Sequence, residues 1–383
     1  MLTPSQSQTS YPAEVPRGNE SSGLETPMGV SVVIATYNRL DGLRSLLVDL
    51  CMQNCDSGSF EVIVVDDESK IAVTPEVADL ARATQLNVSL PFPFRVFRQT
   101  NGGPGAARHR GIKEAQGEIV VILDDDMHIE PGFLRAHIDE HLNGATVVLG
   151  NIQTPRDAKL ALFERFHMGT LDKFVAAVAR GEPVVEGARL CTGNVSFRKN
   201  AYAQVGGFDP NLRRCEDRDL GIRFELAGEQ ISFGAAAISQ HRSDHTDVAT
   251  WRTRNRLYGQ LDTVIAGKHN GLAKVSPWAF LSELPRMATP ISLLSAAFPA
   301  VGKLGGTVAY GVADWLDQRS KSQTALRLVG LCYGLDYYAG VGKAFQTPRG
   351  FIPMVKSFRF FRALAGSSPP PDFPAVSRTK GKR

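Results

Sequence analysis

The stretch EIVVILDDD, residues 118–126, is the part of the sequence that decides the fold. Residues 118–123 form a short apolar, β-branched run, which is typical of a strand buried on both faces of a sheet. Similar runs occur at VSVVIA (30–35), FEVIVV (60–65), FRVF (94–97) and TVVLG (146–150). Helical patterns lie between them, with Leu43, Leu46, Leu47 and Leu50 on one face of the first and others at 75–86 and 104–116. This alternation predicts an α/β fold with a mostly parallel sheet flanked by helices.

Polar residues follow several of these strands directly. Parallel sheets bind ligands at the carboxyl ends of their strands, so these residues are candidates for a binding site. Thr36, Tyr37 and Asn38 follow the first strand, Asp66 and Asp67 the second, and Asp124 to Asp126 the fourth. We therefore expect five carboxylates and a polar turn to meet at one edge of the sheet.

The three consecutive aspartates 124–126 point to a cation. Like charges at this spacing repel, and none of the three has a basic neighbour in the sequence. Hard divalent ions such as Mg²⁺ or Mn²⁺ take carboxylate oxygens and share a bound diphosphate. The alternative is a solvated acidic turn that caps the helix after Pro131.

A second carboxylate group opens the predicted helix in CEDRDLGIRFELAG, residues 215–228. Glu216 and Asp217 fall in its first turn, where the helix dipole favours negative charge, so simple capping is one interpretation. Asp217 lies three residues before Leu220, on the inward side, and an inward carboxylate at a helix start can serve as a general base. Asp219 and Arg223 are an i, i+4 pair, which we interpret as structural.

The glycine-rich stretch NGGPGAARHRG, residues 101–111, resembles a dinucleotide-binding fingerprint but departs from it. A third small residue is expected at position 108, where the sequence has Arg108. The stretch still predicts a flexible turn that opens a helix, with Arg108 and Arg110 as partners for an anion.

Taken together, these motifs resemble family 2 glycosyltransferases with the GT-A nucleotide-sugar fold. The resemblance covers residues 30–245 and rests on seven segments in the same order and spacing as in that family. They are VSVVIATYNR (30–39), FEVIVVDDES (60–69), NGGPGAARHRGI (101–112), GEIVVILDDDMHIEPGFL (117–134), GNVSFRK (193–199), GGFD (206–209) and EDRDLGIR (216–223).

The resemblance implies a role for each matching residue. It places Ala35 and Thr36 at the nucleotide, Asp66 and Asp67 at the nucleobase, and Asn101 and Arg108 along the donor site. Asp124 and Asp125 would contact the sugar nucleotide, and Asp126 would bind a Mn²⁺ or Mg²⁺ ion. Asp217, with Glu216, would lie at the acceptor hydroxyl, where Asp217 is the catalytic base. His241 matches a histidine near the diphosphate and is the second predicted metal ligand, with His245 as the alternative. The implied reaction is inverting transfer from a nucleotide-sugar, with UDP as the expected nucleotide.

Two other functions are alternatives to this one. A nucleotidyltransferase would need a glycine-rich loop with Arg or Lys after the first strand, which ATYNRLDG does not supply. A catalytically silent nucleotide-sugar-binding module is a second alternative. The presence of both Asp126 and Asp217 argues against it. The sequence leaves the acceptor open between a lipid-linked or cell-envelope glycan and a small molecule, and we expect no nucleic-acid partner.

Composition bounds the domain organisation. With 43% hydrophobic and 21% charged residues, the 383-residue chain is long and apolar enough for a core, and five cysteines exclude a disulfide scaffold. We predict a disordered leader at 1–28, which lacks a signal-peptide pattern, and a GT-A domain at 29–245. A helical module at 246–365 and a basic disordered tail at 366–383 complete the chain. The compartment expected from the cysteine usage is the cytoplasm.

The C-terminal module has features of a membrane-interfacial segment. Residues 287–302 carry no charge, but prolines interrupt them, and 325–342 contain Arg327 and Asp336, so neither stretch matches a spanning helix of about 20 apolar residues. Residues 343–383 contain nine basic residues and one acid. We predict peripheral attachment to an anionic surface on the inner face of the cytoplasmic membrane. The alternative is a soluble helical subdomain or a dimer interface.

Overall fold

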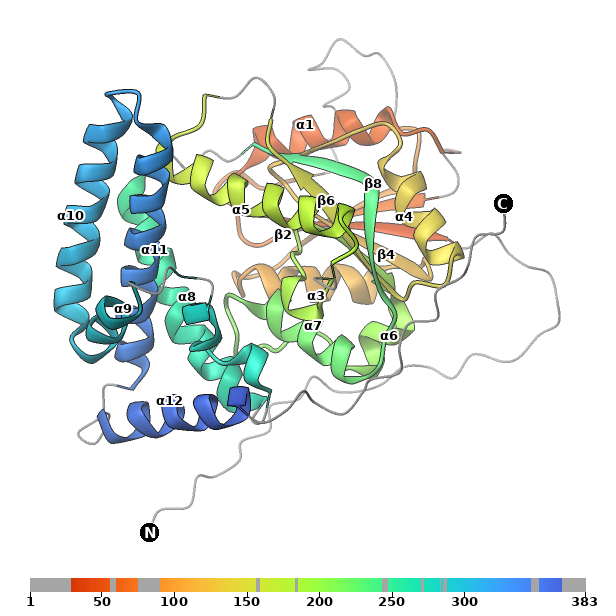
Figure 1. The fold of residues 1–383 in the computed structure, drawn as a ribbon. Coiled ribbons are helices and arrows are strands. Elements are labelled where there is room, and N and C mark those ends of the chain that lie inside the picture. Colours follow the sequence, from red (N-terminus) through yellow and green to blue (C-terminus); the bar gives the residue numbers. More distant parts are fainter. Residues whose placement is uncertain are drawn as a thin grey trace, which may run out of the picture.

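The computed structural model describes residues 29–55, 60–74, 90–155, 159–182, 185–242, 247–269, 272–282, 284, 288–345 and 351–366. The leader predicted at 1–28, the helix predicted at 75–86, the boundary predicted at 245/246 and nearly all of the tail lie outside the described residues. Within them, a sheet with helices on both sides adjoins a group of C-terminal helices (Figure 1).

The sheet has eight strands in the order β3-β2-β1-β4-β7-β6-β8-β5. They are β1 (Val30–Thr36), β2 (Phe60–Asp66), β3 (Phe94–Arg98), β4 (Ile119–Asp124), β5 (Met127–Ile129), β6 (Val147–Gln153), β7 (Asn194–Arg198) and β8 (Ile231–His241). The pairs β1–β2, β1–β4, β2–β3 and β6–β8 are parallel, whereas β7 runs antiparallel to β4 and β6, and β5 to β8. The α/β class is confirmed, and the five predicted strands are present. The apolar runs did not reveal three strands, β5, β7 and β8. The antiparallel pairing of β7 and β5 makes the sheet mixed.

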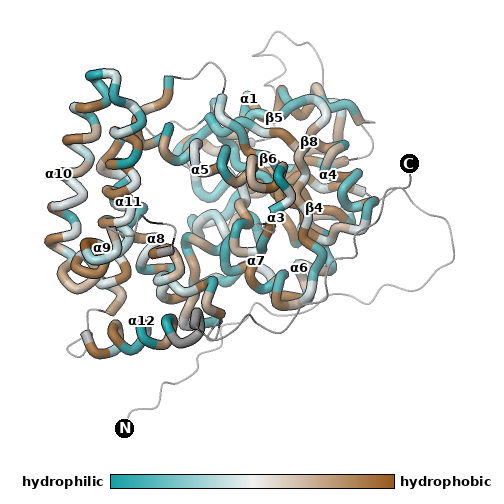
Figure 2. The backbone as a smooth tube through the Cα atoms, viewed as in Figure 1, coloured by the Kyte–Doolittle hydropathy of each residue, from teal (hydrophilic) through white to brown (hydrophobic). Residues whose placement is uncertain are grey.

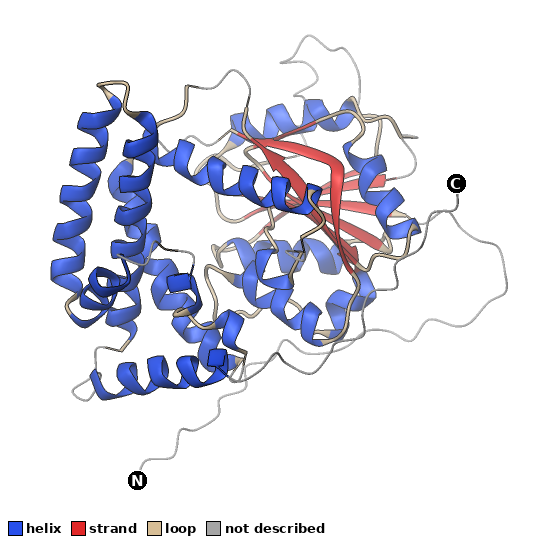
Figure 3. Ribbon diagram, viewed as in Figure 1, coloured by secondary structure: helices blue, strands red, loops and turns tan. Residues whose placement is uncertain are grey.

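Alternate residues of the central strands enter two separate cores, because successive side chains of a strand point to opposite faces. On one face, Val32 and Val62 pack beneath α1 (Leu40–Cys51) and α4 (Phe133–Leu142). On the other face, Val33 and Ile63 pack beneath helices α3 (Pro104–Glu114), α6 (Lys199–Gln204) and α7 (Glu216–Leu226). Figure 3 shows the strands between these helices. Burial on both faces explains why these strands are continuous apolar runs.

The C-terminal helices surround α11 (Ser322–Ala344). Its neighbours are α8 (Val248–Lys268), α9 (Ala288–Ala297), α10 (Pro299–Asp317) and α5 (Leu162–Ala179), the last from the sheet domain. The helix α12 (Phe351–Gly366) packs beside Trp278 through Phe358. Short 3₁₀ turns lie at Gly187–Arg189, Ala273–Val275 and Ala279–Ser282. The helical C-terminal extension that the sequence predicted is therefore present.

Two apolar clusters join this extension to the sheet domain. Leu162 and Phe163 of α5 pack with Ala313 and Val329 of the extension. Ile222 of α7 packs with residues of α8 and the turn after it. Among the described helices, none has both the length and the apolar composition that crossing a membrane requires.

Candidate active site

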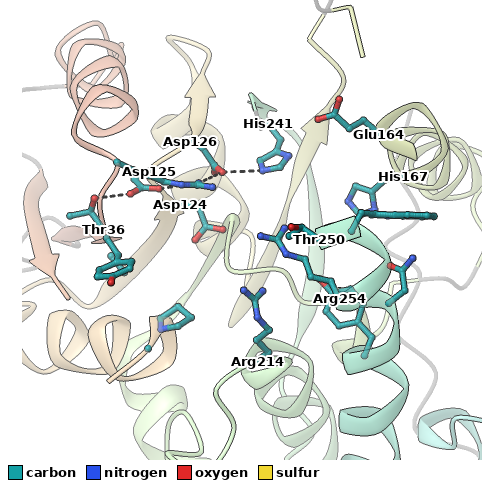
Figure 4. Close-up of a pocket in the computed structure, with 18 of the residues that line it drawn as sticks. Thr36, Asp124, Asp125, Asp126, Glu164, His167, Arg214, His241, Thr250 and Arg254 are labelled. Carbon is teal, nitrogen blue, oxygen red and sulfur yellow. Dashed lines mark hydrogen bonds and ion pairs between the residues drawn. The ribbon is translucent and has the colours of Figure 1, made fainter. Parts of the chain in front are cut away.

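A cavity of ≈ 610 Å³ lies where the sheet meets the helical extension. One wall is formed at the carboxyl ends of β1, β2 and β4, and the other by α5 and α8 (Figure 4). Of the residues predicted for the site, those lining it are Ala35, Thr36, Asp67, Asn101, Arg108, Asp124, Asp125, Asp126 and His241. The structure thus brings together nine of the twelve.

Asp125 is held at the end of β1. The Thr36 hydroxyl donates a hydrogen bond of 2.7 Å to Asp125 Oδ2. Helix α1 approaches the same turn so closely that a Cβ on Gly42 would lie 2.4 Å from the carbonyl oxygen of Asp125. Burial raises the pKa of Asp125 to about 6, with smaller contributions from the neighbouring aspartates. Asp125 is therefore fixed by its surroundings and keeps a proton more readily than an exposed aspartate.

Asp126 lies between Arg39 and His241. Strand β5 pairs Met127 with His241, and this register brings His241 Nε2 within 3.3 Å of Asp126 Oδ2. The Arg39 guanidinium contacts the same oxygen. Burial alone would raise the pKa of Asp126, but the His241 and Arg39 contacts outweigh it and hold the pKa at about 2. Asp126 is therefore an anion at neutral pH.

The chemistry of this corner fits a divalent cation. Asp126 Oδ1 is buried and has no hydrogen-bond partner among the residues that the structure describes. Carboxylate oxygens are the donors that Mg²⁺ and Mn²⁺ prefer, and such ions often complete their coordination with waters and substrate phosphates. Within the described ranges, no group of three or more acidic, histidine or cysteine side chains is arranged to hold a metal. A cation would therefore be shared between Asp126, with His241 beside it, and the phosphates of a ligand.

Asp67 shapes the loop that carries Asn101. Its carboxylate accepts hydrogen bonds from the backbone N–H groups of Gly102 and Gly103, at 3.0 and 2.8 Å, while Asn101 Nδ2 donates to the Asp67 carbonyl at 3.1 Å. This arrangement holds the loop against the end of β2. Asp67 and Asn101, which the sequence predicted separately for the base and the donor site, therefore lie side by side in the cavity wall.

The structure does not place Asp66 in the cavity. Its side chain is fully buried and accepts hydrogen bonds from the N–H groups of Ser69 and Val73 and from Arg98. These bonds occupy both oxygens, so Asp66 secures the turn after β2. The prediction that Asp66 assists in binding the base is therefore not supported by this geometry.

Arg108 connects the aspartates to helix α7. One guanidinium nitrogen lies 2.5 Å from Asp124 Oδ1 and another 2.6 Å from Glu216 Oε1. This bridge explains why an arginine stands where a dinucleotide fingerprint would have a small residue. It also supplies Asp124 with the basic partner that its sequence neighbours lack.

Glu216 and Asp217 lie beyond this bridge and do not line the cavity. They follow Cys215, which adopts a left-handed backbone with φ of 56°, a strained conformation for this residue type. Burial raises the pKa of Glu216 to about 7 although Arg108 opposes the rise, and burial also raises the pKa of Asp217. Asp217, which was predicted to point inward, is half-buried, and its neighbour Glu216 is buried. The predicted Asp219–Arg223 pair is present, at 2.8 Å.

Sequence reasoning missed several residues of the cavity. Arg39 follows the polar turn after β1, and Arg214 precedes the left-handed Cys215. From the extension come Trp251 and Arg254 of α8 and Tyr333 of α11. Figure 4 shows Arg214 and Arg254 directed toward Asp124. The basic and aromatic run WRTRNRLYG, residues 251–259, was compatible both with contact to the donor or an acceptor phosphate and with simple packing on the sheet domain. Spacing alone could not show that α8 would face the aspartates.

Comparisons with known proteins found similarity to glycosyltransferases. Residues 31–196 match the family model described as glycosyl transferase family 2. A pre-mycofactocin glycosyltransferase of Mycobacterium tuberculosis is 30% identical over 252 residues, covering 63% of this chain and 48% of that protein. A dolichol-phosphate mannosyltransferase of Pyrococcus furiosus is 32% identical over 127 residues, covering 32% of this chain and 33% of that protein. The chain thus spans half or less of the length of these two relatives.

Among the solved structures with a similar fold is one that matches most of the chain. It is the mannosyltransferase PcManGT from Pyrobaculum calidifontis in complex with GDP-mannose and Mn²⁺. The TM-score is 0.53 at 17% identity, and the similarity covers 79% of this chain and 85% of that one. At this identity, the similarity concerns the fold.

Proposed function

Because the sheet domain of this chain belongs to glycosyl transferase family 2, we propose that the protein transfers a sugar from a nucleotide-diphosphate donor to an acceptor hydroxyl. We further propose that the donor is a UDP-sugar and that the anomeric configuration is inverted. The observation that carries the proposal is the cavity itself. Asp67 and Asn101 line one part of it, and Asp124, Asp125, Asp126 and His241 line the neighbouring part.

The donor would lie along the strand ends. In this proposal, Ala35, Thr36 and Asp67 contact the nucleoside, and Asp124 with Asp125 contacts the sugar nucleotide. Asp126 and His241 would hold Mn²⁺ or Mg²⁺. When bound, such an ion supplies positive charge that neutralises the leaving diphosphate. Arg39 already contacts Asp126 and lines the cavity, so it could add a second positive charge beside the diphosphate.

The acceptor hydroxyl would be activated by Asp217. The carboxylate takes the hydroxyl proton while the acceptor oxygen bonds to the anomeric carbon. The bond from that carbon to the diphosphate oxygen breaks on the opposite side, and the nucleoside diphosphate leaves with the bonding electron pair. One displacement with no covalent enzyme intermediate inverts the configuration. Glu216 is already engaged by Arg108, so we assign it to positioning, and Asp217 remains the proposed base.

We propose a lipid-linked or cell-envelope glycan as the acceptor and peripheral attachment at the inner face of the cytoplasmic membrane. A relative that is named for dolichol phosphate supports a lipid-linked acceptor. The wall of the cavity formed by α5 and α8 belongs in part to the extension that was predicted to meet the membrane. An acceptor carried at a membrane surface could approach from that wall.

The donor assignment is tested with a panel of UDP-, GDP- and dTDP-sugars in the presence of Mn²⁺. We expect hydrolysis or transfer with the UDP-sugars and none after chelation of the metal, and activity with GDP- or dTDP-sugars alone would contradict the donor assignment. Asp126→Ala should abolish Mn²⁺-dependent nucleotide binding while the protein still folds. The matched control is Asp41→Ala, because the Asp41 side chain is 96% exposed and lies outside the cavity. Full activity of Asp126→Ala in chelator would contradict the cation assignment.

A further inference from the structure

The helices α9 and α10 carry an unusual concentration of exposed apolar side chains. Sixteen large hydrophobic residues are exposed in the part of the chain that the structure describes, and eight of them lie between residues 291 and 315. We call these eight the outer apolar face. It consists of Ile291, Leu294, Phe298, Val301, Leu304, Val308, Val312 and Trp315.

On α10 these residues form one stripe. Val301, Leu304, Val308, Val312 and Trp315 follow one another at intervals of three or four residues, which places them on one side of a helix. The opposite side carries Ala309 and Ala313, which are buried. Because the inner side of α10 is already packed, the outer stripe has no remaining role in the core of this chain. Leu304 is 66% exposed and Val308 is 59% exposed.

The stripe faces away from the rest of the molecule. Figure 1 shows α10 at the outer edge of the helical extension, on the far side of α11 from the sheet. Figure 2 shows hydrophobic residues recurring along α10 and α9. Exposed apolar patches of this extent mark interaction surfaces in soluble proteins.

The exposed charges of the helices α10 to α12 are mostly positive. Exposed basic residues of α10 to α12 and their connecting turns are Lys303, Arg319, Lys321, Arg327, Lys343, Lys356, Arg359 and Arg362. The described acids of the same helices are three. Asp317 pairs with Arg165, Asp336 is buried, and Asp314 alone is exposed.

This charge pattern selects among partners. A negatively charged lipid surface attracts each basic residue near it by about 1 kcal/mol. A second copy of this face would instead bring like charges together. Trp315 adds a further sign, because its ring lies 4.0 Å from the Arg319 guanidinium, and tryptophan and arginine are side chains suited to the headgroup region.

We propose that the outer apolar face docks on the surface of an anionic lipid bilayer. Helix α10 would lie in the plane of the membrane with Leu304, Val308 and Trp315 at the boundary between headgroups and acyl chains. The exposed basic residues on α10 and directly after it, Lys303, Arg319 and Lys321, would contact the headgroups. This assignment specifies the membrane attachment proposed above, on which it rests, and it does not depend on which sugar is transferred.

The test is co-sedimentation of the full chain with phosphatidylcholine vesicles, with and without about 30% phosphatidylglycerol. We expect binding to the anionic vesicles and much weaker binding to the neutral ones. The double variant Leu304→Glu, Val308→Glu should bind about 100-fold more weakly, because two apolar contacts are lost and two negative charges are brought to an anionic surface. Both positions are exposed, so the fold should tolerate the change.

The matched control places the same charges elsewhere. Met52→Glu, Leu142→Glu changes two side chains that are 62% and 61% exposed but belong to the sheet domain. This control carries the same change in net charge as the α10 variant. It should therefore lose only the binding that a general charge effect removes, and should bind anionic vesicles far better than the α10 variant. Equal loss in both double variants would show a general charge effect and would overturn the proposal.

Trp315 provides an independent readout. The chain has three tryptophans, of which Trp278 is 1% exposed and Trp315 is 51% exposed. A blue shift of the emission on vesicle binding should disappear in Trp315→Phe. Sedimentation velocity without lipid supplies the competing outcome. A wild-type dimer that Leu304→Glu, Val308→Glu converts to a monomer, with no vesicle binding by either, would assign the face to self-association instead.

Nucleotide binding separates this proposal from the proposed function. The Leu304→Glu, Val308→Glu variant should bind the donor as the wild type does, since α10 contributes no residue to the lining of the cavity. Loss of vesicle binding with donor binding intact supports the docking face. A chain that docks on vesicles but shows no donor binding would refute the proposed function and leave the docking face standing.

Discussion

At the scale of single residues, Arg108 links the two carboxylate groups of the candidate active site. It contacts Asp124, which we propose for the donor side, and Glu216, which we propose for the acceptor side, and it is almost fully buried. An arginine between two carboxylates limits their repulsion and fixes their separation. Because Arg108 engages Glu216 directly, the two neighbouring acids of α7 have different surroundings, and different roles are expected of them.

The first prediction concerns the proposed base. Asp217→Asn keeps the size of the side chain and removes its basicity, so we expect sugar transfer to fall by about 10²–10⁴-fold. Donor affinity should barely change, because Asp217 does not line the cavity. Transfer rate and donor binding are measured for Asp217→Asn and Glu216→Gln side by side. A greater loss of transfer in Glu216→Gln would exchange the two roles, and a loss of donor binding in Asp217→Asn would remove the base from this mechanism.

The second prediction concerns pH. The pKa of Glu216 is raised to about 7 and that of Asp217 is also raised, so the pair holds a proton below neutrality. The rate of transfer should therefore rise with pH as the pair loses this proton. Glu216→Gln removes a neighbouring negative charge, which lowers the pKa of Asp217 and moves the rise in rate to lower pH. Rates measured between pH 5 and 9 check this, in roughly half-unit steps. An unchanged profile would mean that the two acids do not titrate together.

At the scale of elements, helix α3 lies very close to the sheet at Gly111. A Cβ at this position would lie 2.4 Å from Cγ1 of Val33 on β1, in the centre of the sheet. Val33 is β-branched and buried, so it has little freedom to move aside. This close approach sets the depth at which Arg108, one turn earlier on the same helix, reaches Asp124 and Glu216.

The third prediction compares two identical substitutions in helices. Gly111→Ala should destabilise the protein by about 1–3 kcal/mol because of overpacking. Gly169→Ala in α5 has open space around the new Cβ, and should stabilise by up to about 1 kcal/mol through helix propensity. Urea unfolding gives both values. Similar effects of the two changes would show that α3 can shift away from β1 at little cost.

At the scale of the whole molecule, a buried charge cluster holds α11 against α8. Asp336 of α11 is completely buried and accepts hydrogen bonds from Arg252, at 2.7 and 3.1 Å, and from Arg256, at 2.7 Å. A second bridge continues to the sheet domain. Asp262 of α8 accepts bonds from Tyr337 of α11, at 2.7 Å, and from Arg218 of α7, at 3.0 Å. The extension is thereby connected, through α8, to the helix that carries the proposed base.

The fourth prediction tests the first of these clusters. Asp336→Ala leaves two arginines without their shared partner in a buried setting, and should cost about 3–5 kcal/mol of stability. Asp314→Ala is the control, because Asp314 is exposed on α10 and accepts a hydrogen bond from Gln318 at the end of the same helix. The free energy of unfolding of each variant is measured in urea. A loss below about 1 kcal/mol for Asp336→Ala would show that the arginines find other partners or water.

The sequence by itself determined the α/β class, five strands and most of the cavity wall at the strand ends. The reason is that a strand buried on both faces must be a short apolar run, and that residues following parallel strands must meet at one edge. Thr36, Asp67 and Asp124 to Asp126 could be located in this way. Strands β5, β7 and β8 escaped because they are short or only partly apolar, and their pairing depends on partners far along the chain.

Only the tertiary structure decided which partner each charge has. The pairing of β5 with β8 brings His241 to Asp126, and the packing of α3 on β1 brings Arg108 to Glu216, across more than 100 residues of sequence in each case. It also showed that Asp66, which was predicted to contact the nucleobase, accepts hydrogen bonds within the turn after β2. Local spacing encodes periodicity and burial, but the distance between two side chains depends on how whole elements pack. For the same reason, the apolar residues of α10 were visible in the sequence, while the side of the helix left exposed was decided by its packing on α11.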